Sequence, residues 1–182
     1  MRLFVAIPLA AEVTDALQRL VRKLQSGEDG LRWSAPESWH ITLRFLGETS
    51  AETYVRLVAR LMDVKSPVIP VRLDGTGFFK RSGVFFAGVN VSQEMLGLEK
   101  RVQAATSLCE FVAEDRPFHP HVTLARANGD NRRTVLRRLK LRENDKARFP
   151  AFTATEFVLY EAFLGAGGSR YAVLERFRLG NT

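Results

Sequence analysis

Two stretches of the sequence, His40-Ile41-Thr42-Leu43-Arg44-Phe45 and His121-Val122-Thr123-Leu124-Ala125-Arg126, begin with the same tetrad, H-x-T-L. The residue numbers of the two tetrads differ by 81 (121 minus 40), in a chain that holds only three histidines. Each tetrad alternates polar and apolar side chains, as does a strand with one face toward a core. The pair therefore predicts two strands, each presenting a histidine and a threonine on the same face.

The same offset in residue number superposes further expected elements. Leu3–Ala6 falls on Val84–Ala87, and both are short apolar runs typical of strands. Glu12–Ser26 falls on Gln93–Ser107, and in both segments the apolar residues recur at helical spacing. The agreement of several elements at one offset indicates an internal repeat.

Beyond the tetrads, helices are expected over Ala51–Val64 and Asn131–Leu141. Beyond these helices the repeat is no longer exact. The expected strands Val68–Leu73 and Glu156–Phe163 are about eight residues away from superposition at the offset of 81. A last strand, Arg170–Leu179, forms a hairpin with Glu156–Phe163 across a glycine-rich loop. We therefore expect residues 1–182 to form a single bilobal domain with an internal repeat.

If a pseudo-twofold axis relates the lobes, the two tetrads bring two imidazoles and two hydroxyls into one cleft. This arrangement suits in-line attack on a phosphodiester, because one imidazole can accept a proton while the other donates one. An unperturbed pKa near 6.5 allows both protonation states at working pH. We expect His40 and His121 to be the catalytic pair, and the hydroxyls of Thr42 and Thr123 to bind the phosphate oxygens.

Arg126 ends the second of these strands, where a guanidinium can bind phosphate through two hydrogen bonds. The equivalent residue in the first strand is Phe45, which is not a cation. A position in the core is the simpler interpretation of Phe45, and stacking against an RNA base is the alternative.

The formal charge of +7 lies in one part of the chain. Residues 116–148, here called the basic segment, hold ten Lys and Arg against three acids. In the rest of the chain the numbers of basic and acidic residues are therefore equal. Arg133 and Arg137, on the expected helix Asn131–Leu141, are candidate RNA contacts, although a solvated helix face has the same composition. A non-enzymatic RNA-binding module that uses the basic segment is therefore an alternative function.

A second alternative uses His119, because His119-Pro120-His121 together with His40 would make a three-histidine site for a hydrolytic metal. That model leaves the paired threonines unexplained. The single cysteine, Cys109, excludes an internal disulfide and is expected to be a buried core residue. No apolar run approaches the roughly 18 residues of a membrane span, so we expect a cytoplasmic protein.

The two tetrads with their flanks, together with Arg2–Ile7, Arg116–Arg126 and a strand that begins Ser169-Arg170-Tyr171, resemble the RNA 2',3'-cyclic phosphodiesterases. These are also called 2'-5' RNA ligase-like proteins, within the two-histidine phosphoesterase superfamily. The resemblance implies an α+β fold of two pseudo-symmetric lobes, each an antiparallel sheet with helices packed outside, which face a central cleft.

The resemblance also implies that 2',3'-cyclic phosphate ends of RNA are hydrolysed to 2'-phosphomonoesters without a metal or other cofactor. It assigns His40 as proton donor and His121 as proton acceptor, and it assigns phosphate contacts to Thr42, Thr123 and Arg126. Reversible 2'-5' ligation of RNA is a further activity of some members. We expect a monomer that acts on RNA ends, with no membrane or protein partner.

Overall fold

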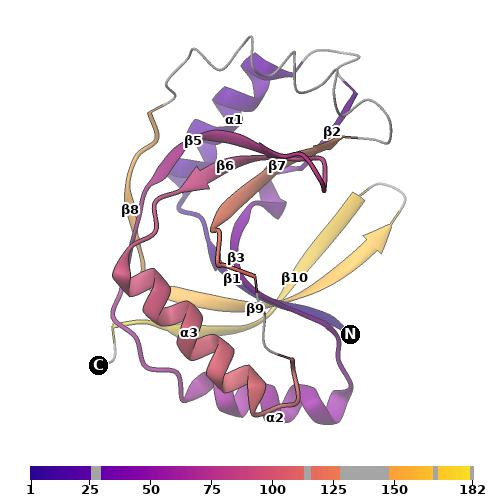
Figure 1. Cartoon of the computed structure of the whole chain (residues 1–182), viewed down its shortest axis with the longest axis vertical. Helices are drawn as coiled ribbons and strands as arrows, with labels where there is room; N and C mark the ends of the chain where they lie inside the picture. The colour runs from indigo at the N-terminus through magenta and orange to yellow at the C-terminus, as the bar shows by residue number, and fades with distance from the viewer. Residues whose placement is uncertain (26–29, 113–115, 128–147, 166–167, 181–182) are drawn as a thin grey trace.

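The computed structural model describes residues 1–25, 30–112, 116–127, 148–165 and 168–180 (Figure 1). Within these residues there are three α-helices, one short 3-10 helix and ten strands. The helices are α1 (Ala11–Leu24), α2 (Ala51–Met62) and α3 (Gln93–Ser107), and the 3-10 helix is η1 (Pro36–Ser38). The strands are β1 (Arg2–Pro8), β2 (Leu31–Trp33), β3 (His40–Glu48), β4 (Ile69–Val71), β5 (Leu73–Phe79), β6 (Val84–Val89), β7 (His121–Ala127), β8 (Phe152–Ala154), β9 (Glu156–Gly165) and β10 (Gly168–Arg178).

Two four-stranded sheets form the body of the molecule. One has the order β10-β9-β1-β3 and the other the order β2-β7-β6-β5, while β4 and β8 form a separate two-stranded ladder. Every pairing is antiparallel. Helix α1 lies behind the sheet of β5, β6 and β7, and α2 and α3 pack together beside the other sheet (Figure 1). The expected α+β fold with antiparallel sheets is therefore confirmed.

The strands that carry the tetrads, β3 and β7, bury their alternate side chains as the sequence predicts. Ile41, Leu43, Val122 and Leu124 are all at most 6% exposed and belong to one continuous hydrophobic core. The opposite face of each strand carries the histidine and the threonine, which are half-buried. We call β3 and β7 the motif strands and this opposite face the site face.

The sheets are not built from consecutive halves of the chain. Strand β5 follows α2 in the first half, yet it lies in the sheet of β7 from the second half. Strand β9, near the C-terminus, pairs with β1 at the N-terminus. Each motif strand therefore lies in a sheet that is completed by strands from the other half of the sequence (Figure 1).

The ladder registers correct one sequence superposition by a single residue. Thr42 pairs with Ala6, and Thr123 pairs with Phe86. The residue numbers of the motif threonines thus differ by 81 (123 minus 42), but those of their partners differ by only 80 (86 minus 6). The superposition of Leu3–Ala6 on Val84–Ala87 was wrong, because two short apolar runs match equally well after a slip of one, although the slip exchanges their faces.

The structure also explains why the expected strands after the second helices lie about eight residues away from the repeat offset. Tyr160 pairs with Phe4, and Phe79 pairs with Val84, at equivalent places in the two sheets. Their residue numbers differ by 81 (160 minus 79), so the counterpart of β9 is β5. The sequence comparison used Val68–Leu73 instead, which contains the short ladder strand β4.

Each motif strand contains a β-bulge immediately after its threonine. The ladder passes from Thr42 to Arg44 against consecutive residues of β1, and from Thr123 to Ala125 against consecutive residues of β6. The extra residue reverses the alternation of faces beyond it. As a result, Phe45 and Arg126 lie on the site face, at equivalent places beyond their histidines.

The expected helices and hairpin are found with small changes at their ends. Helix α3 ends at Ser107 and the backbone turns at Glu110, which has a φ of 69°, so Val112 is 90% exposed. Cys109 is buried as a free thiol, as expected. Strands β9 and β10 form the predicted hairpin. The expected helix Asn131–Leu141 lies outside the described residues. No helix in the described parts of the chain is long and apolar enough to span a membrane.

Candidate active site

His40 and His121 are each held by one hydrogen bond to the backbone two residues earlier. The Nδ1 atom of His40 lies 2.8 Å from the carbonyl oxygen of Ser38, and Nδ1 of His121 lies 2.7 Å from that of His119. A carbonyl oxygen can only accept, so Nδ1 carries the proton in both rings. The lone pair of each neutral ring is therefore on Nε2, which is left available for proton transfer.

The structure brings the two histidines into one site. Strands β3 and β7 contact each other although they belong to different sheets. The rings interact electrostatically, because positive charge on His121 lowers the pKa of His40. Thr42 and Thr123 share the site face with their histidines. Four residues that were singled out from the sequence are therefore assembled at the facing motif strands.

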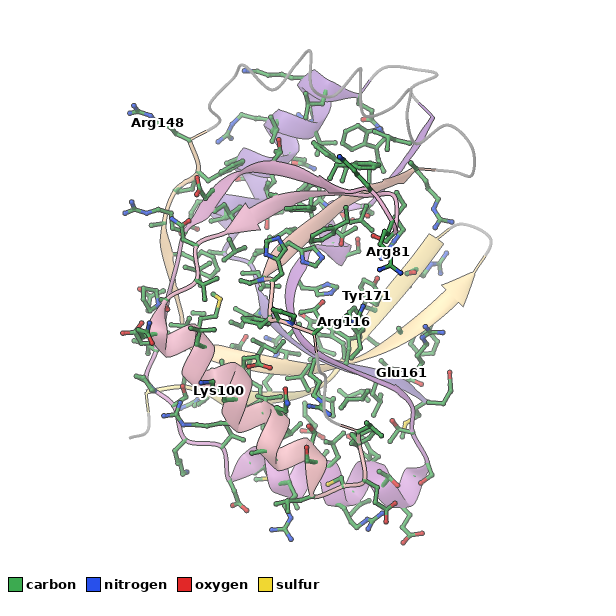
Figure 2. The ribbon with its side chains drawn as sticks, viewed as in Figure 1. Arg81, Lys100, Arg116, Arg148, Glu161 and Tyr171 are labelled. Carbon is green, nitrogen blue, oxygen red and sulfur yellow. The ribbon has the colours of Figure 1, made fainter. Side chains whose placement is uncertain are left out.

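Three aromatic side chains surround the ring of His40. Phe4 on β1 lies 4.7 Å from it between ring centroids, and Tyr171 on β10 and Tyr160 on β9 lie at 5.2 and 5.9 Å. Phe4 also stacks on Tyr160 at 5.1 Å and meets Tyr171 edge-on at 5.0 Å. Tyr171 lies on the side of the β9–β10 hairpin that faces the middle of the molecule (Figure 2). The C-terminal hairpin therefore builds one wall of the site.

His121 has a related but different environment. Phe79 on β5 and Phe86 on β6 lie 5.0 and 5.4 Å from its ring, and they stack on each other at 4.2 Å. The exposed ring of His119 is 6.4 Å away. Gly77 makes room for this stack, because a Cβ atom there would lie 2.8 Å from Cε2 of Phe86. His121 thus has a second imidazole and two phenylalanines beside it, whereas His40 has two tyrosines and one phenylalanine.

Burial lowers the pKa of both catalytic candidates. Desolvation lowers the pKa of His40 to about 4, against the hydrogen bond to Ser38, which raises it. Desolvation also lowers the pKa of His121, and the positive charges of His119 and Arg126 add to this effect. Since both values lie below the ordinary 6.5, both rings are neutral at pH 7.

Phe45 and Arg126 occupy equivalent places beyond the two bulges. The side chain of Arg126 is exposed, and its charge acts on His121. Phe45 is 67% exposed, with its ring 6.1 Å from that of Phe4. The interpretation of Phe45 as a core residue was therefore wrong, because the bulge turns its side chain to the site face. An aromatic ring and a guanidinium flank the histidines, one from each sheet.

The structure describes only residues 116–127 and 148 of the basic segment. Arg133 and Arg137 lie outside the described residues. Of the cations that are described, Arg116 lies near the middle of the molecule and Arg148 projects from its far edge (Figure 2). These two residues therefore do not share one surface.

The three-histidine metal hypothesis can be compared with the geometry directly, because His40, His119 and His121 are all described. Among the described residues, no group of three or more His, Cys, Asp or Glu side chains is arranged to hold a metal ion. His121 interacts with both His40 and His119, but the three imidazoles do not form a ligand set.

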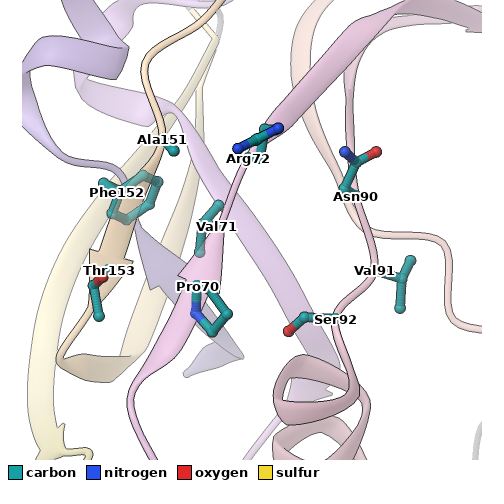
Figure 3. Close-up of a pocket in the computed structure, with 9 residues that line it drawn as sticks. All are labelled: Pro70, Val71, Arg72, Asn90, Val91, Ser92, Ala151, Phe152 and Thr153. Carbon is teal, nitrogen blue, oxygen red and sulfur yellow. The ribbon is translucent and has the colours of Figure 1, made fainter.

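A cavity of about 380 Å³ lies elsewhere, between the β4–β8 ladder and the start of α3 (Figure 3). Apolar side chains such as Val71 and Phe152 line it, together with Arg72, Asn90 and Ser92. None of its lining residues is a histidine or comes from a motif strand. The chemistry described above is therefore not located in this cavity.

Sequence reasoning missed the aromatic residues around the histidines. Phe4 and Phe86 were placed on matched strands, but the slip of one residue concealed which of them face the site. Tyr160 and Phe79 were detectable in principle, because their residue numbers differ by the offset that separates the tetrads. Tyr171 lies in a stretch that had been noted only as part of the C-terminal strand.

Comparisons with known proteins agree with this geometry. A family model described as LigT like Phosphoesterase matches residues 7–86. An RNA 2',3'-cyclic phosphodiesterase of Escherichia coli (strain K12) is 32% identical over 98% of this chain and 96% of its own length. A protein of the same name from Thermus thermophilus is 33% identical over 98% of this chain and 90% of its own length.

Solved structures show the same arrangement over the whole chain. A crystal structure of E. coli LigT complexed with 3'-AMP has a TM-score of 0.81 and is 30% identical. The match covers 98% of this chain and 97% of that one. The two-sheet architecture is thus shared with a protein whose structure holds a nucleotide.

We expect the Gly77→Ala variant to move the ring of Phe86 and to let water reach His121. The pKa of His121 should then rise toward 6.5, because desolvation is the main cause of its low value. The pKa of His40 should not rise, because its own burial is unchanged and positive charge on His121 can only lower it further. NMR titration of the imidazole resonances measures both values in one sample.

The matched control is Gly97→Ala on α3, where a new Cβ would meet only the flexible side chain of Arg101. This variant should leave both histidines unchanged and stabilise the helix by up to about 1 kcal/mol. An unaltered pKa of His121 in Gly77→Ala would show that the stack does not control its solvation.

The low pKa of His40 also predicts how stability depends on pH. Between about pH 6.5 and 4 the unfolded chain binds a proton at this residue and the folded chain does not. The free energy of unfolding should therefore fall as the pH is lowered through this window, by at most about 3 kcal/mol from this residue. Denaturant unfolding of the parent and of His40→Gln from pH 7.5 to 4 measures the difference, which should shrink toward acid pH. A difference that is constant with pH would contradict the prediction.

Proposed function

The chain belongs to the family of RNA 2',3'-cyclic phosphodiesterases, which hydrolyse 2',3'-cyclic phosphates, and we propose that His40 and His121 are its catalytic acid and base. One observation carries this proposal. Both imidazoles are fixed through Nδ1 to a backbone carbonyl, so that Nε2 of each is the atom available at the facing motif strands. An acid and a base on opposite sides of one phosphorus atom are what in-line displacement requires.

In the proposed reaction, water attacks the phosphorus atom of the cyclic phosphate at an RNA end. Nε2 of His121 accepts a proton from the water while the bond between phosphorus and O3' breaks. Nε2 of His40 donates its proton to O3', and the product is a 2'-phosphomonoester with a free 3'-hydroxyl. This order of roles is the one that the family resemblance implies.

The electrostatic environment supports the same order. His119 and Arg126 both place positive charge near His121, and this charge favours its neutral, proton-accepting form. Among the described charges that act on His40, the only cation is His121 itself. A phosphate anion bound between the rings would raise the pKa of His40, so that His40 takes up from solvent the proton that it donates.

The remaining site residues are proposed to bind the substrate. The hydroxyls of Thr42 and Thr123 donate hydrogen bonds to the non-bridging phosphate oxygens, and the guanidinium of Arg126 binds the same anion. The exposed ring of Phe45 offers a face on which a base can stack. All of these groups come from one chain, so the proposed site needs no second copy, and we propose that the protein acts on RNA as a monomer in the cytoplasm. Ligation of 2'-5' RNA ends would be the same displacement with the 5'-hydroxyl of a second RNA in place of water, and cleavage of the 2'-5' linkage would be its reverse.

A substrate with sulfur in place of O3' separates the acid from the base. With the natural substrate, His40→Ala and His121→Ala should each lower kcat by about 10²- to 10⁴-fold. A thiolate leaves without a proton, because its conjugate acid has a pKa near 8.5. Turnover of the 3'-thio cyclic phosphate should therefore recover in His40→Ala and stay low in His121→Ala.

If turnover of the 3'-thio substrate recovered in His121→Ala and stayed low in His40→Ala, His121 would be the acid and His40 the base. Undiminished turnover of the natural substrate by either variant would remove the paired-histidine mechanism. Absence of turnover by the parent would instead favour a role limited to binding RNA. Thermal unfolding of both variants serves as the control for folding.

The exchange of Phe45 for Leu should lower kcat/KM for a 2',3'-cyclic nucleotide by about tenfold, because stacking of one base contributes about 1 to 3 kcal/mol. Phe163→Leu is the matched control. Phe163 is also an exposed phenylalanine, but it pairs with Arg170 on the face of β9 opposite Tyr160. Steady-state kinetics of both variants decides the matter, and equal losses in the two would contradict stacking at Phe45.

A further inference from the structure

A second arginine stands directly beside Arg126. Strand β2 pairs with β7 so that Arg32 is opposite Arg126. The neighbours of Arg32 on its strand, Leu31 and Trp33, pack against the hydrophobic core, and Trp33 meets Phe85 edge-on at 5.9 Å. The side chain of Arg32 therefore points the other way, to the site face that carries Arg126, and it is exposed.

This pair is electrostatically unfavourable in the absence of an anion. Residues directly opposite each other in antiparallel strands have Cβ atoms about 5 Å apart, and like charges at such a pair destabilise the sheet. Within the described residues, the ion pairs include no carboxylate partner for Arg32 or Arg126. Two adjacent exposed guanidiniums that face one way are suited to an anionic ligand with more than one phosphate.

The backbone holds this strand firmly against the catalytic centre. The amide of Ser34 donates a 2.8 Å hydrogen bond to the carbonyl of Leu124, next to the bulge of β7. From there the chain continues through η1 to His40. Arg32 is thus fixed in the same segment that delivers the first histidine, and beside the strand that delivers the second.

We propose that Arg32 binds the phosphodiester on the 5' side of the terminal nucleotide, while Arg126 binds the reacting cyclic phosphate. This inference rests on the proposed function, because it takes the reacting phosphate to lie at His40 and His121. It identifies the substrate as an RNA end with at least one further phosphate. A cyclic mononucleotide with a 5'-hydroxyl leaves Arg32 without a partner.

Three substrates test the proposal. They are 2',3'-cyclic AMP with a 5'-hydroxyl, the same nucleotide with a 5'-phosphate, and the dinucleotide ApA with a 2',3'-cyclic phosphate end. Arg32→Gln should raise KM about tenfold for the two substrates that have a phosphate at the 5' position, with little change in kcat. Its kcat/KM for the 5'-hydroxyl nucleotide should equal that of the parent.

The salt dependence provides a second readout. A phosphate contact contributes about −0.7 to the slope of log affinity against log salt for single strands, so the slope for the dinucleotide should become less steep by about that amount. Arg32→Lys, which keeps the charge, should recover most of the slope. The matched control is Arg60→Gln, an equal loss of charge at an exposed position on α2, and it should leave all three substrates unaffected.

Equal losses on all three substrates would overturn the proposal, because Arg32 would then act on the reacting phosphate. Unchanged kinetics on all three would also overturn it. If the parent hydrolysed none of the three, the proposed function would fail. The proposal for Arg32 would then be decided by binding of the dinucleotide, and equal affinities of Arg32→Gln and Arg60→Gln would overturn it.

Discussion

The site depends on one extra residue in each motif strand. Without the bulges, strict alternation would direct Phe45 and Arg126 to the core and bring Arg44 and Ala125 to the site face. In the observed register, Arg44 is the buried cation, and its guanidinium donates to the carbonyls of Phe111 and Val112. Beyond the bulge of β7, the strand carries an arginine to the site face, and β2 then places a second one beside it. A one-residue irregularity of the backbone therefore selects which charges can meet a ligand.

The two sheets use equivalent backbone positions for different chemistry. Where the first sheet has Phe45, Tyr160 and Ala6, the second has Arg126, Phe79 and Phe86. The first sheet surrounds its histidine with aromatic rings, which favour contact with a base or sugar. The second adds guanidinium and imidazole groups, which favour a phosphate. An RNA end is asymmetric in the same sense, since the terminal sugar and base lie on one side of the reacting phosphorus and the anionic phosphate oxygens lie on the other.

The sequence predicts the strands, the helices and the meeting of His40 with His121 because these depend on local periodicity and on a repeated tetrad. The sequence-based predictions were wrong or incomplete where the position of a residue depends on how strands pair. The face of Phe45 depends on a bulge that no residue type announces, and the exchange of β5 and β9 between sheets depends on long-range pairing. The aromatic wall around His40 has the same origin, because Tyr171 is far from it along the chain and comes near only through the pairing of β10, β9 and β1. Charge counting was also incomplete, since it directed attention to residues 116–148 and overlooked Arg32.

In the proposed mechanism, the burial of both histidines links proton transfer to substrate binding. In the free protein, desolvation keeps both rings neutral at pH 7, and a neutral pair has a base but no acid. A bound phosphate changes the two rings unequally. At His121, the charges of His119 and Arg126 oppose the uptake of a proton, whereas His40 has aromatic neighbours and would gain an anion as its partner. The anion therefore favours protonation at His40. On this argument, the substrate itself creates the acid, and the cations of the second sheet decide which imidazole remains the base.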